Sequence, residues 1–106
     1  MVFYSNIARY DLQNIYDGLL KWQTENGQLY MDYVAVVNYH NKLLDVCDAV
    51  GNLSSHALAK YSDHKRYGVY VYTYKRHKRT CWYIIYDRLG ENILIQKIMN
   101  NYQTIA

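Results

Sequence analysis

Residues 67–102, with the sequence YGVYVYTYKRHKRTCWYIIYDRLGENILIQKIMNNY, decide the fold of this chain. Three runs rich in Tyr, Val, Ile and Trp are separated by two polar turns; the runs cover 69–74, 81–87 and 93–99, and the turns cover 75–79 and 88–92. Runs of this composition, bounded by turn residues, are typical of a half-buried antiparallel sheet. The stretch therefore predicts a three-stranded meander.

The first part of the chain predicts a short strand and a helix. Residues 1–4 are apolar and end at the polar pair Ser5-Asn6, as a first strand would. From residue 7 onward, apolar side chains recur every three or four residues, which is the spacing of one buried helical stripe. The stripe consists of Ala8, Leu12, Ile15, Leu19 and Trp22. Ser5 or Asn6 can cap this helix, and Asn26-Gly27 can end it.

A second helix is expected over residues 31–50, ended by Gly51. Its broad apolar face comprises Val36, Val37, His40, Leu43, Leu44, Cys47 and Val50. The polar stretch 52–66 follows, with a short helical turn expected at 57–61. The resulting order is β-α-α-β-β-β, which predicts an α+β fold with two N-terminal helices packed on one face of a small antiparallel sheet. The length of 106 residues suits a single domain spanning 1–106.

The predicted sheet carries apolar residues on both faces. On one face, Tyr74 is expected to pair with Trp82, Tyr72 with Ile84 and Tyr70 with Tyr86. The alternate positions are also mostly apolar: Val71, Thr73, Tyr83, Ile85, Ile95 and Met99. Because two helices can cover only one face of so small a sheet, the pattern predicts an exposed apolar surface that a partner covers. Burial of that face by a chain tail or by a homodimer is the alternative.

The composition points to a folded protein of the cytoplasm. No apolar stretch approaches the ~20 residues needed to cross a bilayer, so no membrane association is expected. The opening residues lack the basic start and long apolar run of a signal peptide. Cys47 and Cys81 lie far apart in sequence on elements that both look buried, so we expect reduced core cysteines.

Positive charge is concentrated in the last part of the chain. Residues 1–59 hold three cations and six anions, whereas residues 60–106 hold nine cations and three anions, giving net charges of −3 and +6. Five of those nine cations lie between residues 75 and 88: Lys75, Arg76, Lys78, Arg79 and Arg88. A solvated sheet edge kept soluble by charge is one interpretation, but the neighbouring aromatic residues favour binding of a polyanion such as a nucleic acid. These five residues are therefore the predicted nucleic-acid contacts.

The motifs of nucleotide and metal chemistry are missing from this sequence. The five glycines form no phosphate-binding loop, and the four histidines show no metal-ligand spacing with each other or with the cysteines. The sequence thus predicts no cofactor and no metal. Cleavage of RNA by its own 2′-hydroxyl remains possible without metal if a base, an acid and phosphate-stabilising cations converge. The candidates are Arg76, Lys78, Arg79, Lys97 and Tyr102, although a salt-bridge role for Lys97 and a packing role for Tyr102 are the simpler readings of each alone.

Two segments resemble a known family. The opening Phe3-Tyr4-Ser5-Asn6-x-Ala8-x-x-Asp11-Leu12-x-x-Ile15-Tyr16 resembles the start of ParE-type toxins, where Ser-Pro-x-Ala-x-x-Asp-Leu-x-x-Ile leads a first strand into a first helix. Asn6 stands where proline is usual. The run Trp82-Tyr83-Ile84-Ile85-Tyr86 and the run at 93–99 are similar to the paired last strands of the RelE/ParE superfamily. The β-α-α-β-β-β order agrees with that fold, so the resemblance covers essentially the whole chain.

The resemblance implies the toxin of a type II toxin–antitoxin system, of the plasmid-stabilisation type, with a cognate antitoxin as partner. RelE-like members cleave mRNA on the ribosome with basic residues and often a C-terminal tyrosine, whereas ParE-like members inhibit DNA gyrase and need no catalytic set. The ribonuclease pattern is incomplete here. Tyr83 stands where arginine is usual, the family's His-Tyr ending is Asn101-Tyr102, and expected lysines are replaced by Val69, Val71 and Thr73. The ParE-type ending, often a histidine and an arginine, is also absent, because Asn100 and Tyr102 hold those positions.

ParE-like inhibition of gyrase is preferred over the alternative, a metal-independent mRNA endonuclease, because the opening motif matches ParE-type toxins and the ribonuclease set is incomplete. In the endonuclease, Tyr102 would act as acid or base while Arg76, Arg79 and Lys97 stabilise phosphate charge. A third reading is a decayed, non-toxic member that retains only nucleic-acid or antitoxin binding. The sequence leaves open whether the chain is an enzyme and whether it forms a homodimer.

Overall fold

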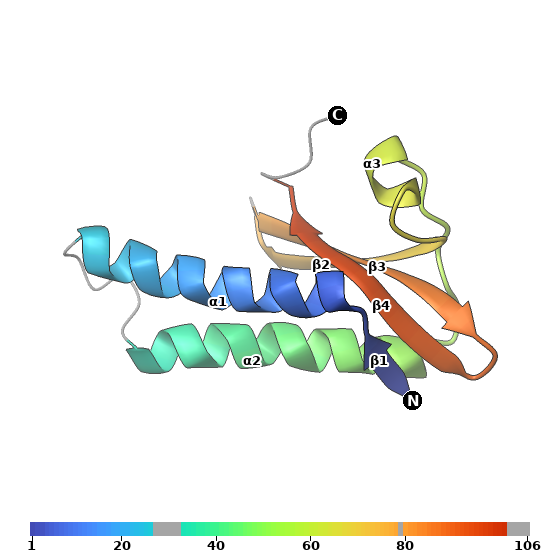
Figure 1. Ribbon diagram of the computed structural model, residues 1–106, viewed down its shortest axis with the longest axis horizontal. Coiled ribbons are helices and arrows are strands. Elements are labelled where there is room, and N and C mark those ends of the chain that lie inside the picture. The colour runs from blue at the N-terminus through green and yellow to red at the C-terminus, as the bar shows by residue number, and fades with distance from the viewer. Residues whose placement is uncertain (27–32, 79, 102–106) are drawn as a thin grey trace.

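The computed structural model describes residues 1–26, 33–78 and 80–101 as an α+β fold (Figure 1). Its strands are β1 (Val2–Tyr4), β2 (Tyr70–His77), β3 (Thr80–Leu89) and β4 (Asn92–Asn100). Its helices are α1 (Asn6–Asn26), α2 (Tyr33–Ala49), the 3-10 turn η1 (Val50–Asn52) and the short α3 (Ser62–Lys65). The expected order of strands and long helices is present, with α3 added before the meander.

The sheet is mixed, which corrects the expectation of an antiparallel sheet. Its strand order is β1-β4-β3-β2, and the pairs β2–β3 and β3–β4 are antiparallel. β1 lies parallel to β4, with Val2 opposite Ile93 and Tyr4 opposite Ile95. β1 is the first strand of the chain and β4 is the last, so the order of the elements alone does not determine whether these two strands run parallel or antiparallel. The expected hairpin register of β2 and β3 is confirmed at all three predicted pairs.

The helices α1 and α2 run side by side, cover one face of the sheet and extend beyond its end (Figure 1). The predicted stripes account for this packing, because Ala8, Val36 and Cys47 are fully buried and Leu43 is 1% exposed. Ala8, Leu43 and Cys47 share one core cluster with Trp82, Ile84 and Tyr86 of β3 and with Ile93, Ile95 and Ile98 of β4. The side chain of Trp22, the helix stop at Gly27 and the start of the second helix at residue 31 lie outside the described residues.

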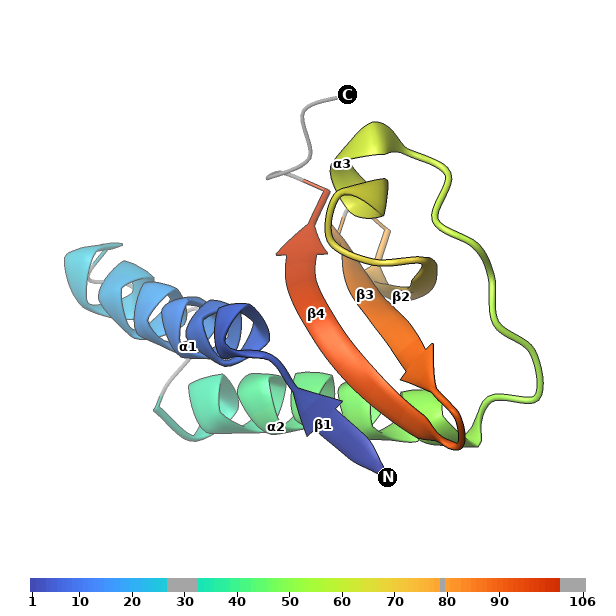
Figure 2. The ribbon, with the colours of Figure 1, turned by 45° about the vertical axis from the view of Figure 1, so that its right-hand side comes forward.

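The other face of the sheet is covered by the segment that contains α3, as Figure 2 shows. Ile85 is fully buried on this face and Met99 is 7% exposed. A Cβ added at Gly68 would lie 3.0 Å from Ile85 Cγ2 and 3.1 Å from the Tyr86 carbonyl oxygen, so the chain passes directly over β3. The prediction of an exposed apolar second face is therefore wrong where this segment lies. The segment that was taken for a polar connection supplies the cover.

The short helix lies at Ser62–Lys65 rather than at the expected 57–61. Residues 57–59 are extended instead, because they bond to the edge of β2: the Ala59 N–H donates to the Val69 carbonyl at 2.8 Å, and the Val71 N–H donates to the Ala57 carbonyl at 2.9 Å. Tertiary hydrogen bonding to a strand edge thus overrides the local helical tendency.

A bulge in β4 changes which side chains face the helices. Ile85 of β3 lies opposite Lys97, but the next residue, Tyr86, lies opposite Ile95, so Gln96 is inserted. One extra residue reverses the alternation of side chains along a strand. Ile95 consequently packs in the helix-covered core, and its predicted place on the second face is wrong.

Candidate functional site

The first residues of α1 are attached to β4 through Ser5. The Ser5 hydroxyl accepts a hydrogen bond from the Ala8 N–H at 3.0 Å and donates to the Gln96 carbonyl at 3.1 Å. Its backbone N–H also donates to the Ile95 carbonyl at 2.9 Å. The first contact is an N-cap, which satisfies an orphan amide at the start of the helix. Ser5 therefore starts the helix and fixes it beside the bulge in the last strand.

Asp11 makes the second attachment, one and a half turns further along α1. Its Oδ2 accepts the backbone N–H of Ile98 at 3.0 Å, and its Oδ1 lies 2.8 Å from Lys97 Nζ. β1 pairs with β4 only as far as Ile95, so this part of the β4 edge would otherwise present an unpaired N–H. With 8% of its surface exposed, Asp11 is a buried carboxylate satisfied by one backbone amide and one cation.

Lys97, a predicted catalytic cation, takes part in this structural contact. Its ammonium group binds Asp11 and lies 5.3 Å from the centre of the Tyr67 ring. A cation that is neutralised by a buried carboxylate and packed over an aromatic ring has little charge left for a phosphate. The salt-bridge reading that the sequence allowed for Lys97 is the one that the structure shows.

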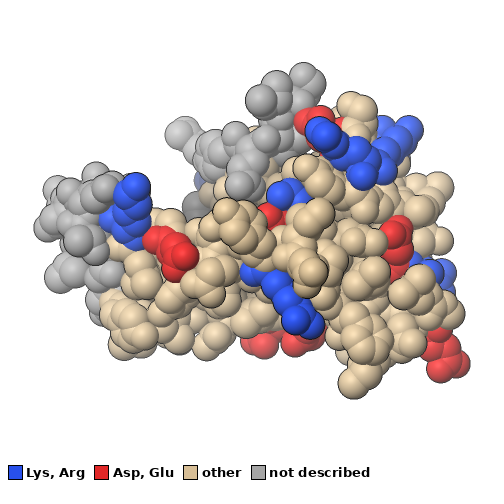
Figure 3. All heavy atoms as spheres, in the orientation of Figure 1, with Lys and Arg blue, Asp and Glu red and all other residues tan. Residues whose placement is uncertain are grey.

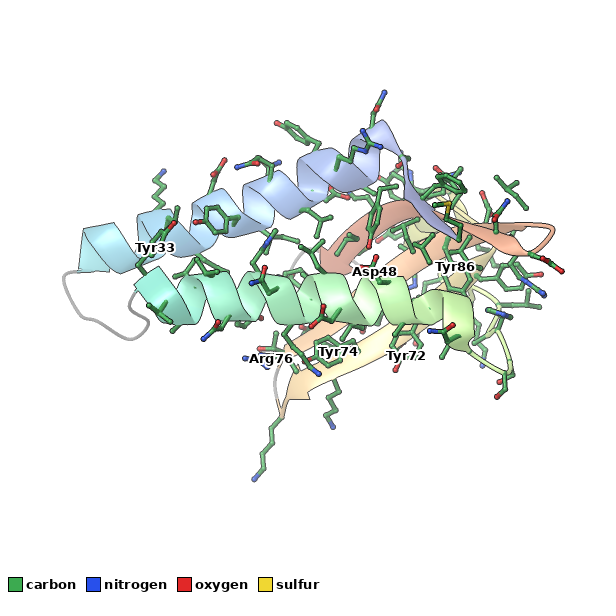
Figure 4. All side chains as sticks on the ribbon, turned by 90° about the horizontal axis from the view of Figure 1, so that it is seen from below. Tyr33, Asp48, Tyr72, Tyr74, Arg76 and Tyr86 are labelled. Carbon is green, nitrogen blue, oxygen red and sulfur yellow. The ribbon has the colours of Figure 1, made fainter. Side chains whose placement is uncertain are left out.

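Arg76 lies on the helix-covered face, away from Lys97. Its guanidinium group lies 4.6 Å from the centre of the Tyr39 ring on α2, and the Tyr39 hydroxyl accepts a hydrogen bond from Trp82 Nε1 at 2.9 Å. Figure 4 shows Arg76 in line with Tyr72 and Tyr74 along β2, beside α2. The structure therefore does not bring Arg76 and Lys97 together. The other two catalytic candidates, Arg79 and Tyr102, lie outside the described residues.

The predicted nucleic-acid contacts do not form one patch. Lys75, Arg76 and Lys78 are exposed near the turn between β2 and β3. Arg88 is exposed near the opposite end of β3, where it lies 5.9 Å from the centre of the Tyr70 ring. Because Lys75 is opposite Cys81, Arg88 lies seven residues further along the strand, or roughly 23 Å at ~3.3 Å per residue. The turn itself is the basic feature.

A second group of cations, which the sequence argument did not single out, lies on and beside α3. Lys60, Lys65 and Arg66 are exposed there, and basic side chains gather over α3 in Figure 3. In the sequence these cations are spread along a connection between elements, whereas the cations of the turn are nearly contiguous and form the more evident cluster.

His64 is the most unusual ionisable group in the described structure. It is 1% exposed, and neither ring nitrogen has a hydrogen-bond partner. Its ring packs at 4.7 Å from Tyr83 and 5.4 Å from Tyr61. Desolvation by burial lowers the pKa of His64, opposed by Asp63, which raises it. A neutral imidazole enclosed by aromatic rings anchors α3 on the sheet, and no feature of its sequence context indicated this.

Two tyrosines of β3, Tyr83 and Tyr86, are poor general bases. Burial is the largest cause that raises the pKa of Tyr83, and burial also raises the pKa of Tyr86, against the opposing effect of Arg88. A tyrosine base needs the opposite, a pKa lowered by neighbouring cations. The Tyr86 hydroxyl lies 2.6 Å from His56 Nδ1, which gives it a structural partner in the core.

A cleft of about 330 Å³ lies between the helices and the ends of the last two strands. Its lining comprises Asp11, Asn14, Ile15, Gly18 and Leu19 of α1, Tyr39 of α2, Thr80 and Trp82 of β3, and Ile98 and Asn100 of β4. Gly18 contributes open space, because a Cβ built there meets no heavy atom within 4 Å. The cleft borders the basic turn through Thr80, so a ligand could contact both.

Within the described residues, no group of three or more His, Cys, Asp or Glu side chains is placed to hold a metal ion. The described cysteines are free, with Cys47 buried and Cys81 partly exposed, so Cys81 is less buried than expected. None of the described helices combines the length and apolar character needed to span a bilayer. Comparisons with protein-family models, with curated proteins and with solved structures give no match for this chain.

Proposed function

We propose that this chain is a toxin of the RelE/ParE type, neutralised by a co-encoded antitoxin. The observation that carries the proposal is the junction of α1 with β4. The resemblance rests on two segments at opposite ends of the chain, and Ser5 and Asp11 of the first segment bond to Ile95, Gln96, Lys97 and Ile98 of the second.

The spacing of the opening motif has a physical reason in this junction. Ser5 caps the helix, and Ala8 and Leu12 bury their side chains at 0% and 8% exposure. Asp11 covers the strand edge where β1 ends. Each of the four residue types thus has a structural role at its position, which supports the resemblance of the opening motif.

Inhibition of DNA gyrase is the preferred action, because the described catalytic candidates do not converge. Lys97 binds Asp11, and Arg76 stacks on Tyr39 on the other side of the sheet. Metal-free RNA cleavage needs a base, an acid and a cation around one phosphate. A toxin that acts by binding gyrase has no such requirement.

The alternative is a ribosome-dependent mRNA endonuclease, favoured by one observation. Lys75, Arg76 and Lys78 are exposed beside the β2–β3 turn, where the Arg76 guanidinium group lies above the Tyr39 ring. In this alternative the turn binds ribosomal RNA, while Arg79 and Tyr102 act in the cleavage of mRNA. A non-toxic domain that binds only nucleic acid or antitoxin is the third outcome.

The test is tightly induced expression in a bacterial host, with growth, mRNA cleavage and gyrase-linked DNA breaks measured in one culture. Growth arrest with double-strand breaks, unchanged by Tyr102→Phe, is the expected result. Arrest with mRNA cuts at fixed codon positions, abolished by Tyr102→Phe combined with Arg79→Ala, would replace gyrase with the ribosome as target. Normal growth with abundant folded protein would overturn the toxin proposal.

A further inference from the structure

The outer edge of β2 is occupied along only part of its length. Residues 57–59 pair with it in the antiparallel direction, through a bridge between Leu58 and Tyr70. Two backbone hydrogen bonds hold this pairing, one from the Ala59 N–H to the Val69 carbonyl and one from the Val71 N–H to the Ala57 carbonyl. This half of the edge therefore already accepts an added segment of chain.

The rest of the edge is open in the described structure. Because the Val71 N–H points away from β3, the alternation of an antiparallel ladder also turns the N–H and C=O groups of Thr73 and Lys75 outward. No described segment makes a backbone hydrogen bond to either residue. A row of unpaired donors and acceptors on an edge strand is a template for another strand.

A groove of about 520 Å³ lies along this edge. One wall comes from the segment before α3, with Leu53, Ser55, Ala57, Leu58, Lys60 and Tyr61, and the other comes from Val71, Tyr72, Thr73 and Tyr86. Lys60 is the one charged residue among these described lining residues. Two further exposed cations lie outside the groove lining, Lys75 further along β2 and Lys78 in the turn after it, so positive charge continues along the open part of the edge.

We propose that the open half of the β2 edge binds an acidic peptide in extended conformation, added to the sheet as a further strand beyond residues 57–59. Strand addition of this kind takes affinity from main-chain bonds and specificity from the pockets for alternate side chains. Thr73 and Lys75 supply the main-chain groups, the groove takes an apolar side chain, and Lys60, Lys75 and Lys78 select carboxylates. The inference stands whether or not the chain is a toxin.

Charge decides between an acidic peptide and a second copy of this chain. Two copies paired through the same edge would place Lys75 and Lys78 of each near those of the other, and like charges across a strand pair are destabilising. The cations also prevent pairing with neutral or basic edges, which is a common way to protect an exposed strand. An acidic strand would instead place carboxylates opposite these lysines, and the interaction between the charges would be attractive.

The probes are two fluorescent nine-residue peptides in which valine alternates with glutamate in one and with lysine in the other. The acidic peptide should bind the full chain at least tenfold more tightly than the basic one, measured by fluorescence anisotropy at ~0.1 M salt. In amide hydrogen exchange, Thr73 and Lys75 should exchange quickly in the free protein and become protected with the acidic peptide. Equal affinity for both peptides, or protection confined to other residues, would overturn the proposal.

Variants separate main-chain pairing from charge. Lys75→Glu should lower affinity for the acidic peptide at least tenfold, while the matched charge reversal Arg88→Glu, at the far end of β3, should change it less than twofold. Thr73→Pro removes an outward N–H that the β2–β3 ladder does not use, so it should retain the fold and reduce binding as strongly. Equal loss in Lys75→Glu and Arg88→Glu would show only a general electrostatic attraction. Binding of a single-stranded oligonucleotide at this edge, unaffected by Thr73→Pro, would assign the cations to nucleic acid and overturn the peptide proposal.

Discussion

Replacement of Asp11 by alanine should destabilise the fold more than any other single carboxylate change in the described structure. Asp11 is 8% exposed and bonds both to the Ile98 N–H at 3.0 Å and to Lys97 Nζ at 2.8 Å. Alanine leaves the Ile98 N–H buried without a partner and leaves Lys97, whose side chain is 21% exposed, without its counter-ion.

The size of the loss follows from those two groups. Leaving the Ile98 N–H buried without an acceptor costs about 1–3 kcal/mol, and loss of the ion pair with the partly exposed Lys97 adds about 1 kcal/mol, so we expect about 3 kcal/mol in total. At roughly 4–8 °C per kcal/mol for a domain of about this size, the melting temperature should fall by about 12–24 °C. Asp11→Asn keeps an oxygen acceptor for the Ile98 N–H and loses only the ion pair, so it should cost about 1 kcal/mol.

Urea unfolding followed by circular dichroism measures both changes. Asp17→Ala is the matched control, because Asp17 is an exposed carboxylate on the same helix whose Oδ1 accepts a hydrogen bond from the nearby Gln13 side chain at 2.9 Å. It should change the free energy of unfolding by less than about 0.5 kcal/mol. A loss below about 1 kcal/mol for Asp11→Ala, or equal losses for alanine and asparagine, would refute the structural role assigned to Asp11.

Three further predictions concern other parts of the fold. Gly18→Ala should raise the free energy of unfolding by about 0.5–1 kcal/mol, because the residue is inside a helix and its Cβ would meet no heavy atom within 4 Å; lower stability in urea would contradict this. Burial raises the pKa of Cys47 to about 12, so its thiol should resist a thiol reagent until the chain unfolds. The partly exposed Cys81 should react in the native state. Rapid reaction of both cysteines in the native protein would contradict this packing. His64 has a pKa below its unfolded value of ~6.5, so the unfolded state binds more protons as pH falls below that value, and stability should decrease. His64→Phe should flatten that dependence in unfolding experiments at pH 5–8, and an unchanged slope would assign the effect to other groups.

The sequence predicted the elements well where period and pairing act locally. The stripe from Ala8 to Leu19 predicted α1, and the tyrosine-rich runs predicted β2 and β3 together with their register. That register follows from the turn and from alternation over a short separation, so the sequence contains what is needed to set it.

Whether the candidate site residues converge could not be predicted from the sequence, because convergence depends on the sheet face on which each residue lies and on its partner there. Arg76 and Lys97 carry the charge that phosphate chemistry needs, but they lie on different faces and each has a partner, Tyr39 and Asp11 respectively. His64 escaped notice because its enclosure depends on Tyr83, which is 19 residues away on a strand. Burial of this kind depends on packing between segments that are far apart in the sequence, and neither residue spacing nor composition indicates it.

By itself, the sequence determined the order of strands and long helices, the apolar stripes and the hairpin, because each follows from residues a few positions apart. Only the tertiary structure decided that β1 runs parallel to β4, that the segment containing α3 covers the second face, and that one extra residue, Gln96, turns Ile95 toward the helices. These features arise where segments that are not neighbours in the sequence pack together or share hydrogen bonds, or where a strand departs from regular pairing. At such places, the need to satisfy buried backbone groups outweighs local preference.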